Sequence, residues 1–348
     1  MFGLDARAAR AAWTVIFIVL LAGGLYLIRR TLLIFVFALL FAYLLSPLVD
    51  LVDRFRAKRF PRNLSLAVVY LLMIAVLATS MAAIGSRIGA EASNLARTLP
   101  KYLENPQAIP RLPIPAWLEP YKDAAIETLR VQLESHARDV VPMLAKAGET
   151  LLAVFGNLVF VLLVPILSFF FLKDSRDIRG LILEQFADGA PRRLVEDIFT
   201  DVHVLLAQFM RALVLLSLVT FTVYWLFLAV IGVPYALLLA VVAGLLDFIP
   251  VAGPLAAALV ILVVAGFAGY PHLLWIVVFL VAFRLFQDYV AQPYLLGSGV
   301  ELPPGVVIFG VLAGEQIGGV TGMFLSIPVL ATLRVVYVRF RKGRRARS

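Results

Sequence analysis

The stretch GLLDFIPVAGP, residues 244–254, interrupts a run of residues that is otherwise almost wholly apolar. It places Asp247 ahead of two prolines, each of which lacks a backbone donor and breaks the hydrogen-bond ladder of a helix. The flanking apolar segments, 235–246 and 255–268, hold twelve and fourteen residues. Because a helix needs about 20 residues to cross the hydrocarbon core of a bilayer, neither segment can span it alone. The stretch therefore predicts two half-helices that meet at a buried turn.

The composition indicates a polytopic membrane protein. Of 348 residues, 62% are hydrophobic and only 15% are charged, and the mean hydropathy of +0.96 lies far outside the range of soluble domains. The absence of cysteine excludes disulfides and thiolate sites, and the three scattered histidines lack metal-ligand spacing, so neither a metal nor a cofactor is expected. The net charge of +9 lies largely in short loops and the C-terminus, which favours anionic lipid over nucleic acid as a partner.

Apolar segments long enough to cross a membrane set the domain organisation. We expect residues 1–84 to hold the first three transmembrane helices and 85–150 to form a small helical extramembrane domain. Residues 151–348 are then the transport core, with a cytoplasmic loop at 173–201. The predicted full spans are 11–28, 32–49, 64–84, 151–172 and 204–231, and the helix 273–296 is the sixth. Basic residues crowd the loop 50–62 and the tail 339–348, which places both on the cytoplasmic side and 85–150 on the outer side.

A second interruption lies near the C-terminus. Residues 305–338 would form a helix of about 50 Å if continuous, but the sequence GEQIGG at 314–319 breaks them and carries Glu315. Counting 235–268 and 305–338 as hairpins keeps the basic tail cytoplasmic and leaves six full spans. The predicted fold is therefore an all-α polytopic membrane protein with about six full transmembrane helices and two broken or re-entrant helical hairpins. The alternative is that proline and glycine merely kink two packed helices.

A polar stripe is expected on the helix between the hairpins, residues 273–296. Arg284, Asp288 and Gln292 recur every four residues, with Gln287 beside them, so all four are expected to project from one face. Asp288 can pair with Arg284 one turn earlier, which lowers the free energy of burying either charge. An internal ion pair that holds helices together and a solute path are compatible interpretations of this stripe.

Paired broken apolar segments are typical of the binding sites of secondary transporters. Asp247 and Glu315 are candidates for proton or sodium coupling, because a carboxylate in a low-dielectric site can load and release a proton. No phosphate-binding loop, nucleophile elbow or H-E-x-x-H motif occurs, so neither an ATP-driven pump nor an enzyme is expected. A non-transporting oligomeric scaffold is the alternative from another class. The candidate substrate- or ion-binding residues are Asp247, Pro250, Gly253, Pro254, Arg284, Gln287, Asp288, Gln292, Glu315 and Gln316.

Four stretches also carry a family resemblance. They are FALLFAYLLSPLVDLVDR (37–54), FFFLKDSRDIR (169–179), GVPYALLLAVVAGLLDFIPVAGP (232–254) and QDYVAQPYLLGSGVELPPGVVIFGVLAGEQIGGVTGMFLSIPVLA (287–331). Together they resemble the autoinducer-2 exporter family of bacterial membrane proteins. The resemblance implies an inner-membrane protein with an outward-facing helical domain, assembled as a homo-oligomer, a pentamer, that exports small polar solutes. It also leaves sodium/proton antiport open, since some relatives resemble such antiporters. Glu315 stands where many relatives have glycine or a small apolar residue.

Overall fold

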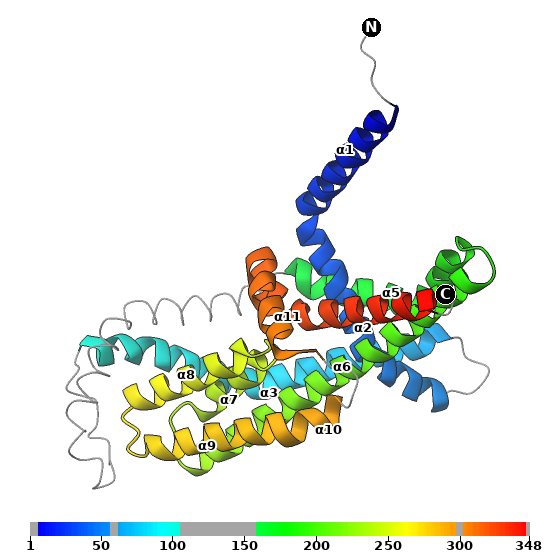
Figure 1. The fold of residues 1–348 in the computed structure, drawn as a ribbon. Helices are drawn as coiled ribbons and strands as arrows, with labels where there is room; N and C mark the ends of the chain where they lie inside the picture. Colours follow the sequence, from blue (N-terminus) through cyan, green and yellow to red (C-terminus); the bar gives the residue numbers. More distant parts are fainter. Residues whose placement is uncertain (1–5, 56–61, 105–157, 297–301, 346–348) are drawn as a thin grey trace.

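The computed structural model describes residues 6–55, 62–104, 158–296 and 302–345 (Figure 1). Within these ranges the chain is helical and holds no strand, as the sequence predicts. The elements are α1 (Ala6–Leu27), α2 (Arg29–Phe55), α3 (Arg62–Glu104), α5 (Leu158–Glu184), α6 (Ala190–Val230), α7 (Ala236–Leu246), α8 (Ala252–Phe267), α9 (Leu273–Phe286), the π-helical turn η3 (Gln287–Ala291), α10 (Gln292–Leu296) and α11 (Pro304–Arg345).

The apolar helices match a multi-pass membrane protein. Four helices of the described ranges are long and apolar enough to cross a bilayer, namely Thr31–Arg54, Ala190–Val230, Leu273–Leu295 and Pro304–Gly343. Helix α1 extends away from the rest of the bundle (Figure 1), and those of its side chains that the structure describes are exposed, with Trp13 72% and Leu27 84% exposed. Apolar surface on this scale is stable against lipid or a partner chain but not against water.

Helix α6 is the central helix of the bundle. It contacts α7, α2, α11, α10 and α5 along its length. The largest core cluster joins α6, α7, α8 and α9 through fully buried side chains such as Leu228, Leu239, Ile261 and Ile276. Aromatic rings of α6 and α9 lie against one another in this cluster, with the centroids of Phe227 and Phe279 stacked 3.8 Å apart. This packing fixes the short helices α7 and α8 in place.

Two further clusters complete the bundle. One joins α2, α6 and α11 through Leu40, Phe209 and Phe324, and the other joins α2, α3 and α5 through Val49, Leu66 and Leu172. In the third cluster the hydroxyls of Tyr70 on α3 and Ser168 on α5 are hydrogen-bonded to each other while both are buried. Helix α2 therefore links the N-terminal helices to the part of the bundle that holds the helix breaks.

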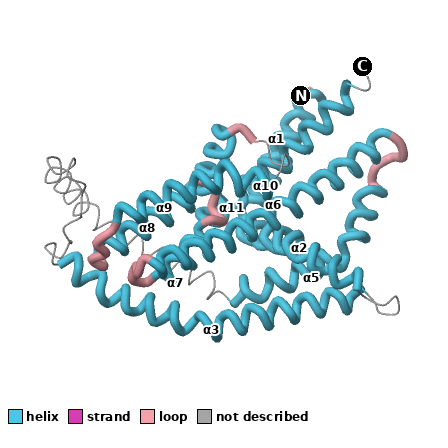
Figure 2. The backbone as a smooth tube through the Cα atoms, turned by 90° about the horizontal axis from the view of Figure 1, so that it is seen from below, coloured by secondary structure: helices cyan, strands magenta, loops and turns pink. Residues whose placement is uncertain are grey.

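Two helices continue past the ends expected from hydropathy. The third span was predicted to end at residue 84, but α3 runs on to Glu104 as one helix of 43 residues (Figure 2). Helix α5 likewise passes the predicted end at residue 172 and reaches Glu184, so that much of the expected loop 173–201 is a hairpin of α5 and α6. Most of the predicted extramembrane domain lies in residues 105–157, outside the described residues.

Candidate functional site

The predicted break after α7 is present and is sharply turned. Helix α7 ends at Leu246, and α8 begins at Ala252. Val251, which precedes α8, has a positive φ of 63°, a conformation that is strained for a β-branched residue. A Cβ atom on Gly253 would lie 1.7 Å from the carbonyl oxygen of Leu246, so only glycine fits there. The chain therefore folds back so closely that backbone touches backbone.

Asp247 lies in this turn and is held by two side chains from other elements. Thr220 Oγ1, on α6, donates to Asp247 Oδ2 at 2.8 Å. Gln287 Nε2, on η3, donates to the same carboxylate oxygen at 3.1 Å and to Thr220 Oγ1 at 2.8 Å. Thr220 and Gln287 are each 3% exposed. We call Asp247, Thr220 and Gln287 the Asp247 cluster; it joins three elements that are far apart in the sequence.

The hydrogen-bond capacity of each group fits this geometry. The amide nitrogen of Gln287 carries two hydrogens and uses one for each partner, while the hydroxyl of Thr220 accepts one hydrogen and donates its own to the carboxylate. A buried polar cluster whose members satisfy one another avoids the desolvation penalty of an unpaired group. The cluster is therefore a stable way to keep a carboxylate beside a helix break.

Close packing of α7 against α6 and α3 positions the turn. Ser217 Oγ donates to the carbonyl oxygen of Gly244 at 2.7 Å, and a Cβ on Gly244 would lie 3.1 Å from Phe221 Cβ. At the other end of α7, Glu91 Oε2 on α3 accepts from the backbone N–H of Leu238 at 2.9 Å. A carboxylate at this position satisfies a free N–H group and interacts favourably with the helix dipole.

The expected polar stripe is divided between two surfaces. Residues 287–291 form a π-helical turn, and Gln287 points into the Asp247 cluster instead of lying beside Arg284 and Asp288. The predicted pairing of Asp288 with Arg284 is confirmed: Arg284 Nε and Nη2 lie 2.9 and 2.8 Å from the two carboxylate oxygens. Gln292 Nε2 donates to Asp288 Oδ1 at 3.3 Å. Both members of the ion pair are 38% exposed, so they flank the cluster and do not enter it.

The second predicted break is also present, in α11. Gly318 and Gly319 have non-helical backbone angles. A Cβ on Gly314 would lie 2.3 Å from the carbonyl oxygen of Gly322, and a Cβ on Gly310 would lie 2.3 Å from Leu330. Residues before the break thus pack against residues after it. Gly314 faces Gly322 and Gly310 faces Leu330, so the contacting residues are farther apart in the sequence the farther they lie from the break. The two arms of α11 fold back on each other.

The acids of the two breaks do not share a hydrogen-bond partner within the described residues. Glu315 and Gln316 are exposed, and neither hydrogen-bonds to another residue in the described part of the chain. The turn after α7 instead meets α11 through aromatic rings, with the centroids of Phe248 and Phe324 6.2 Å apart. The two breaks thus meet through an aromatic contact, and of the two acids only Asp247 is hydrogen-bonded to other elements within the described residues.

The remaining candidate residues shape the turn. Pro250 and Pro254 are half-buried beside it, and the carbonyl oxygen of Ile249 accepts from Gly253 N at 3.0 Å. A cavity of about 640 Å³ lies elsewhere, between α2, α5, α6 and α11, and is lined mostly by apolar side chains. Thr220 was missed at the sequence level, although Ser217 and Thr220, three residues apart in an apolar span, put two hydroxyls on one helix face.

Comparison with known proteins gives a family match over nearly the whole chain. Residues 15–342 match the model of the AI-2E family transporters. The chain is 25% identical to YueF of Bacillus subtilis over 93% of its own length and 90% of that protein. It is 24% identical to AI-2 transport protein TqsA of Escherichia coli over 91% of its length and 88% of TqsA. Since the family model covers nearly the whole chain, this membrane protein belongs to the AI-2E family of transporters.

Proposed function

We propose that the chain is a secondary transporter that exports a small polar solute by alternating access, with the Asp247 cluster as its polar centre. The observation that carries the proposal is the position of Asp247 in a helix break, bonded to side chains of α6 and η3. Transporter sites are commonly built at broken helices, where side chains and freed backbone groups bind the cargo. The family membership supports transport, and the name of TqsA supports an autoinducer-2-like signal as one cargo.

The chemistry of the cluster suits an oxygen-rich solute. A carboxylate, a hydroxyl and an amide supply both donors and acceptors within hydrogen-bond distance of one another. A solute hydroxyl can replace Thr220 or Gln287 as the partner of Asp247, so that binding exchanges one satisfied hydrogen bond for another. Arg284 and Asp288 then form the flank of the path, and the turn from Pro250 to Pro254 is its movable wall.

Sodium/proton exchange is the second candidate, and a specific observation favours it. Asp247 is the one acid of the described α7 and α8 segments, half-buried in an otherwise apolar turn. A carboxylate there can take up a proton or a sodium ion on one side of the membrane and release it on the other. The same group can serve as the coupling site for solute export, with Glu315 as a second, exposed acid.

The topology that we propose has six full crossings and two re-entrant hairpins at 235–268 and 305–338. The loop 50–62 and the tail 339–348 face the cytoplasm of a bacterial cell, in its inner membrane, because both are basic. The open apolar face of α1 supports self-association as a homo-oligomer, proposed as a pentamer. Cysteine substitutions in the tail and in 85–150, labelled from each side of intact cells, test the orientation.

The function is tested by flux into proteoliposomes. Asp247→Asn keeps the shape of the side chain and removes its charge, so we expect solute flux to fall while the oligomer and the helical content stay unchanged. Asp188→Asn is the matched control, since Asp188 lies in the α5–α6 turn with its side chain 89% exposed. Full flux in Asp247→Asn, Asp288→Asn and Glu315→Gln would overturn the proposed transport site, whereas no flux in the wild type would leave the scaffold hypothesis.

The two transport candidates are separated in vesicles that are acidified inside. If sodium added without an organic solute releases the proton gradient, and Asp247→Asn abolishes the release, the chain is a sodium/proton antiporter. If the gradient collapses only when the solute is added, the chain exports the solute in exchange for protons. The comparison uses one preparation, so differences in orientation or copy number cannot produce the result.

A further inference from the structure

The cavity between α2, α5, α6 and α11, with a volume of about 640 Å³, has the size of a ligand pocket, since such pockets enclose roughly 300 to 1,000 Å³. Three of its walls, α2, α6 and α11, belong to helices that are long and apolar enough to cross a bilayer. Leu39, Val329 and Leu333 line the cavity and are 38, 46 and 58% exposed, so it opens onto the apolar surface of the bundle. A ligand can therefore enter it from the lipid phase.

Aromatic contacts hold α2 against two of the other walls. The ring centroids of Phe35 on α2 and Phe171 on α5 are 5.9 Å apart. Those of Phe37 on α2 and Phe324 on α11 are 5.1 Å apart and stacked. Pairs of this kind stabilise a contact beyond the area that they bury, so α2 has a fixed distance from α5 and α11.

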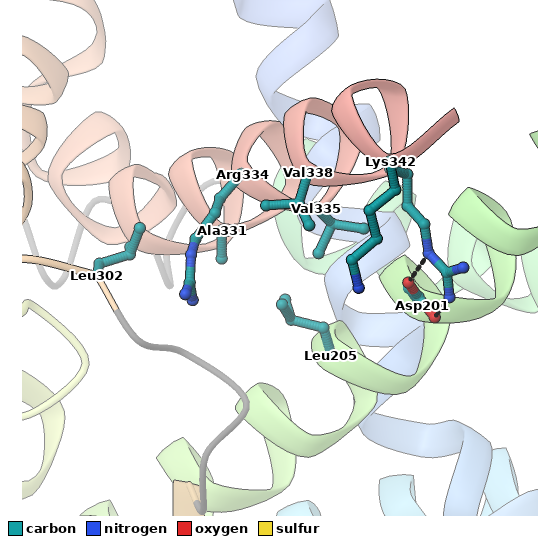
Figure 3. A pocket seen from close by; sticks show the side chains of 9 residues that line it. Asp201, Leu205, Leu302, Ala331, Arg334, Val335, Val338 and Lys342 are labelled. Atoms are coloured by element: carbon teal, nitrogen blue, oxygen red, sulfur yellow. Dashed lines mark hydrogen bonds and ion pairs between the residues drawn. The ribbon is translucent and has the colours of Figure 1, made fainter. Parts of the chain in front are cut away.

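Hydrogen bonds hold α6 against the remaining walls. Arg179 Nη2 on α5 donates to Glu196 Oε1 and Thr200 Oγ1 on α6 at 3.2 and 3.3 Å. Arg339 Nε and Nη2 on α11 donate to the two carboxylate oxygens of Asp201 on α6 at 2.6 and 2.8 Å, a contact drawn as a dashed line at Asp201 in Figure 3. All four walls are therefore tied to their neighbours, and the cavity is preformed.

Two polar groups of the lining are available to a ligand. The hydroxyl of Tyr43 on α2 and the imidazole of His203 on α6 hydrogen-bond to no other residue in the described part of the chain. Their ring centroids are 5.2 Å apart, so the two groups are neighbours. The hydroxyls of Ser175 and Thr332 instead donate to carbonyl oxygens of their own helices. Since a tyrosine hydroxyl in an apolar setting usually has a partner, Tyr43 and His203 are suited to donate to an acceptor oxygen of a ligand.

Water fits this lining poorly. At about 30 Å³ for each molecule, the cavity would take about 20 waters, and each ordered water needs two to four polar partners. The described lining offers five polar side chains, namely Tyr43, Ser175, Arg179, His203 and Thr332. A ligand with an apolar body and a few acceptor oxygens therefore matches the cavity better than water does.

The polar groups lie toward one end of the cavity. Tyr43 is the last lining residue of α2, and Arg179 is the last of α5. Beyond them α2 leads to the basic loop 50–62 and α5 to the turn before α6, both on the side proposed to be cytoplasmic. Tyrosine is typical of the interface between hydrocarbon and water, so the polar end lies where a bilayer holds the ester groups of its lipids.

The charge of the lining is already compensated at this end, because Arg179 is paired with Glu196. Recognition of a neutral ester therefore fits the lining better than recognition of an anionic headgroup. We propose that the cavity binds a diacyl glycerolipid, with an acyl chain in its apolar part and an ester carbonyl oxygen that accepts hydrogen bonds from Tyr43 and His203. The site is separate from the Asp247 cluster and does not depend on the proposed transport.

Two phosphatidylcholines of equal chain length test the site, one with ester-linked chains and one with ether-linked chains, which lack the carbonyl oxygens. Each is added to the full-length protein in an uncharged detergent after native lipid is removed, and the melting temperature is followed. A hydrogen bond to a neutral acceptor is worth about fivefold in affinity. With two such bonds, half-maximal stabilisation of the wild type should need about 25-fold less ester lipid than ether lipid.

Two variants identify the donors. Tyr43→Phe should reduce the preference for the ester lipid to about fivefold, and Tyr43→Phe with His203→Phe should abolish it. Tyr337→Phe is the matched control, since Tyr337 is 65% exposed on α11 and lies outside the lining; it should keep the preference of the wild type. Because Tyr43→Phe removes a single oxygen atom, it keeps the test valid even if the double variant fails to fold.

The proposal is overturned if the two lipids stabilise the wild type at equal concentrations. It is also overturned if Tyr43→Phe and Tyr337→Phe show the same preference. If neither lipid changes the melting temperature and Tyr43→Phe dissociates the oligomer in gel filtration, a second copy of the chain covers the cavity in place of a lipid.

Discussion

Replacing Gly253 by alanine should destabilise the protein, whereas the same replacement at Gly266 in the same helix should not. A Cβ on Gly253 would lie 1.7 Å from the carbonyl oxygen of Leu246, although real Cβ atoms are essentially never found within 3.0 Å of another heavy atom. The nearest neighbour of a Cβ on Gly266 is Leu273 Cδ1 at 3.8 Å, an ordinary contact. Since the atom that Gly253→Ala would strike is backbone, no rotamer change can relieve the clash.

The magnitude follows from what must move. Separating the added Cβ from the carbonyl by the missing 1.3 Å is an overpacking defect of about 1 to 3 kcal/mol. The same carbonyl accepts the N–H of Ile249 at 2.8 Å, and weakening that bond adds about 1 kcal/mol. Gly253→Ala should therefore lose about 2 to 4 kcal/mol, whereas Gly266→Ala should gain up to about 1 kcal/mol from its higher helix propensity.

Thermal unfolding of the two variants in detergent, followed by circular dichroism, measures the difference directly. Flux is measured in the same preparations, because the turn that Gly253→Ala distorts also carries Asp247. If Gly253→Ala melts with the wild type while Gly266→Ala is the less stable variant, the close return of α8 onto α7 is wrong and the candidate site loses its geometry.

Three more perturbations test other contacts. Glu91→Gln should weaken the cap on α7 by about 0.5 to 1 kcal/mol. The melting temperature of the variant should be lower than that of the wild type, and high salt should not change it further. Arg339 lowers the pKa of Asp201 in the folded protein. The Arg339–Asp201 pair therefore stabilises the fold fully above the unfolded pKa of aspartate, and this stabilisation is lost as the pH falls through the lower folded pKa. In Arg339→Gln the melting temperature should consequently depend less on pH in the acidic range. Tyr70→Phe should lower the free energy of unfolding by about 0.5 to 1.5 kcal/mol, measured by unfolding in denaturant. The loss should not be larger, because Ser168 Oγ keeps its hydrogen bond to the carbonyl oxygen of residue 165 at 2.9 Å.

The sequence predicts the helix breaks well because proline and glycine act locally. The breaks at 247–254 and at 314–319 were expected from the residues themselves, and both are present where the backbone cannot continue as a helix. Helices α3 and α5 continue beyond the predicted spans for a different reason. Hydropathy reports where a helix leaves the bilayer, whereas alanine, glutamate and arginine continue it in water.

The partners of Asp247 could not be predicted, because they depend on packing between distant elements. Thr220 is 27 residues from Asp247 in the sequence, and its hydroxyl could equally have bonded to its own helix. Gln287 was expected beside Arg284 and Asp288 on the assumption of regular α-helical spacing. Gln287 instead bonds to Thr220 on α6, and it begins a π-helical turn at residues 287–291, a deviation that is frequent at functional sites and has no clear local signal.

Asp247 and Glu315 look equivalent in the sequence, but a change of charge at each affects a different set of hydrogen bonds. Asp247 shares one carboxylate oxygen between Thr220 and Gln287, so its neutralisation weakens the bonds to α6 and η3 together. Glu315 is exposed and lacks such bonds within the described ranges, so its neutralisation changes only its own solvation. An ion can move helices only by binding their two arrangements with different affinity. Of the two acids, Asp247 therefore meets this physical requirement for the proposed coupling.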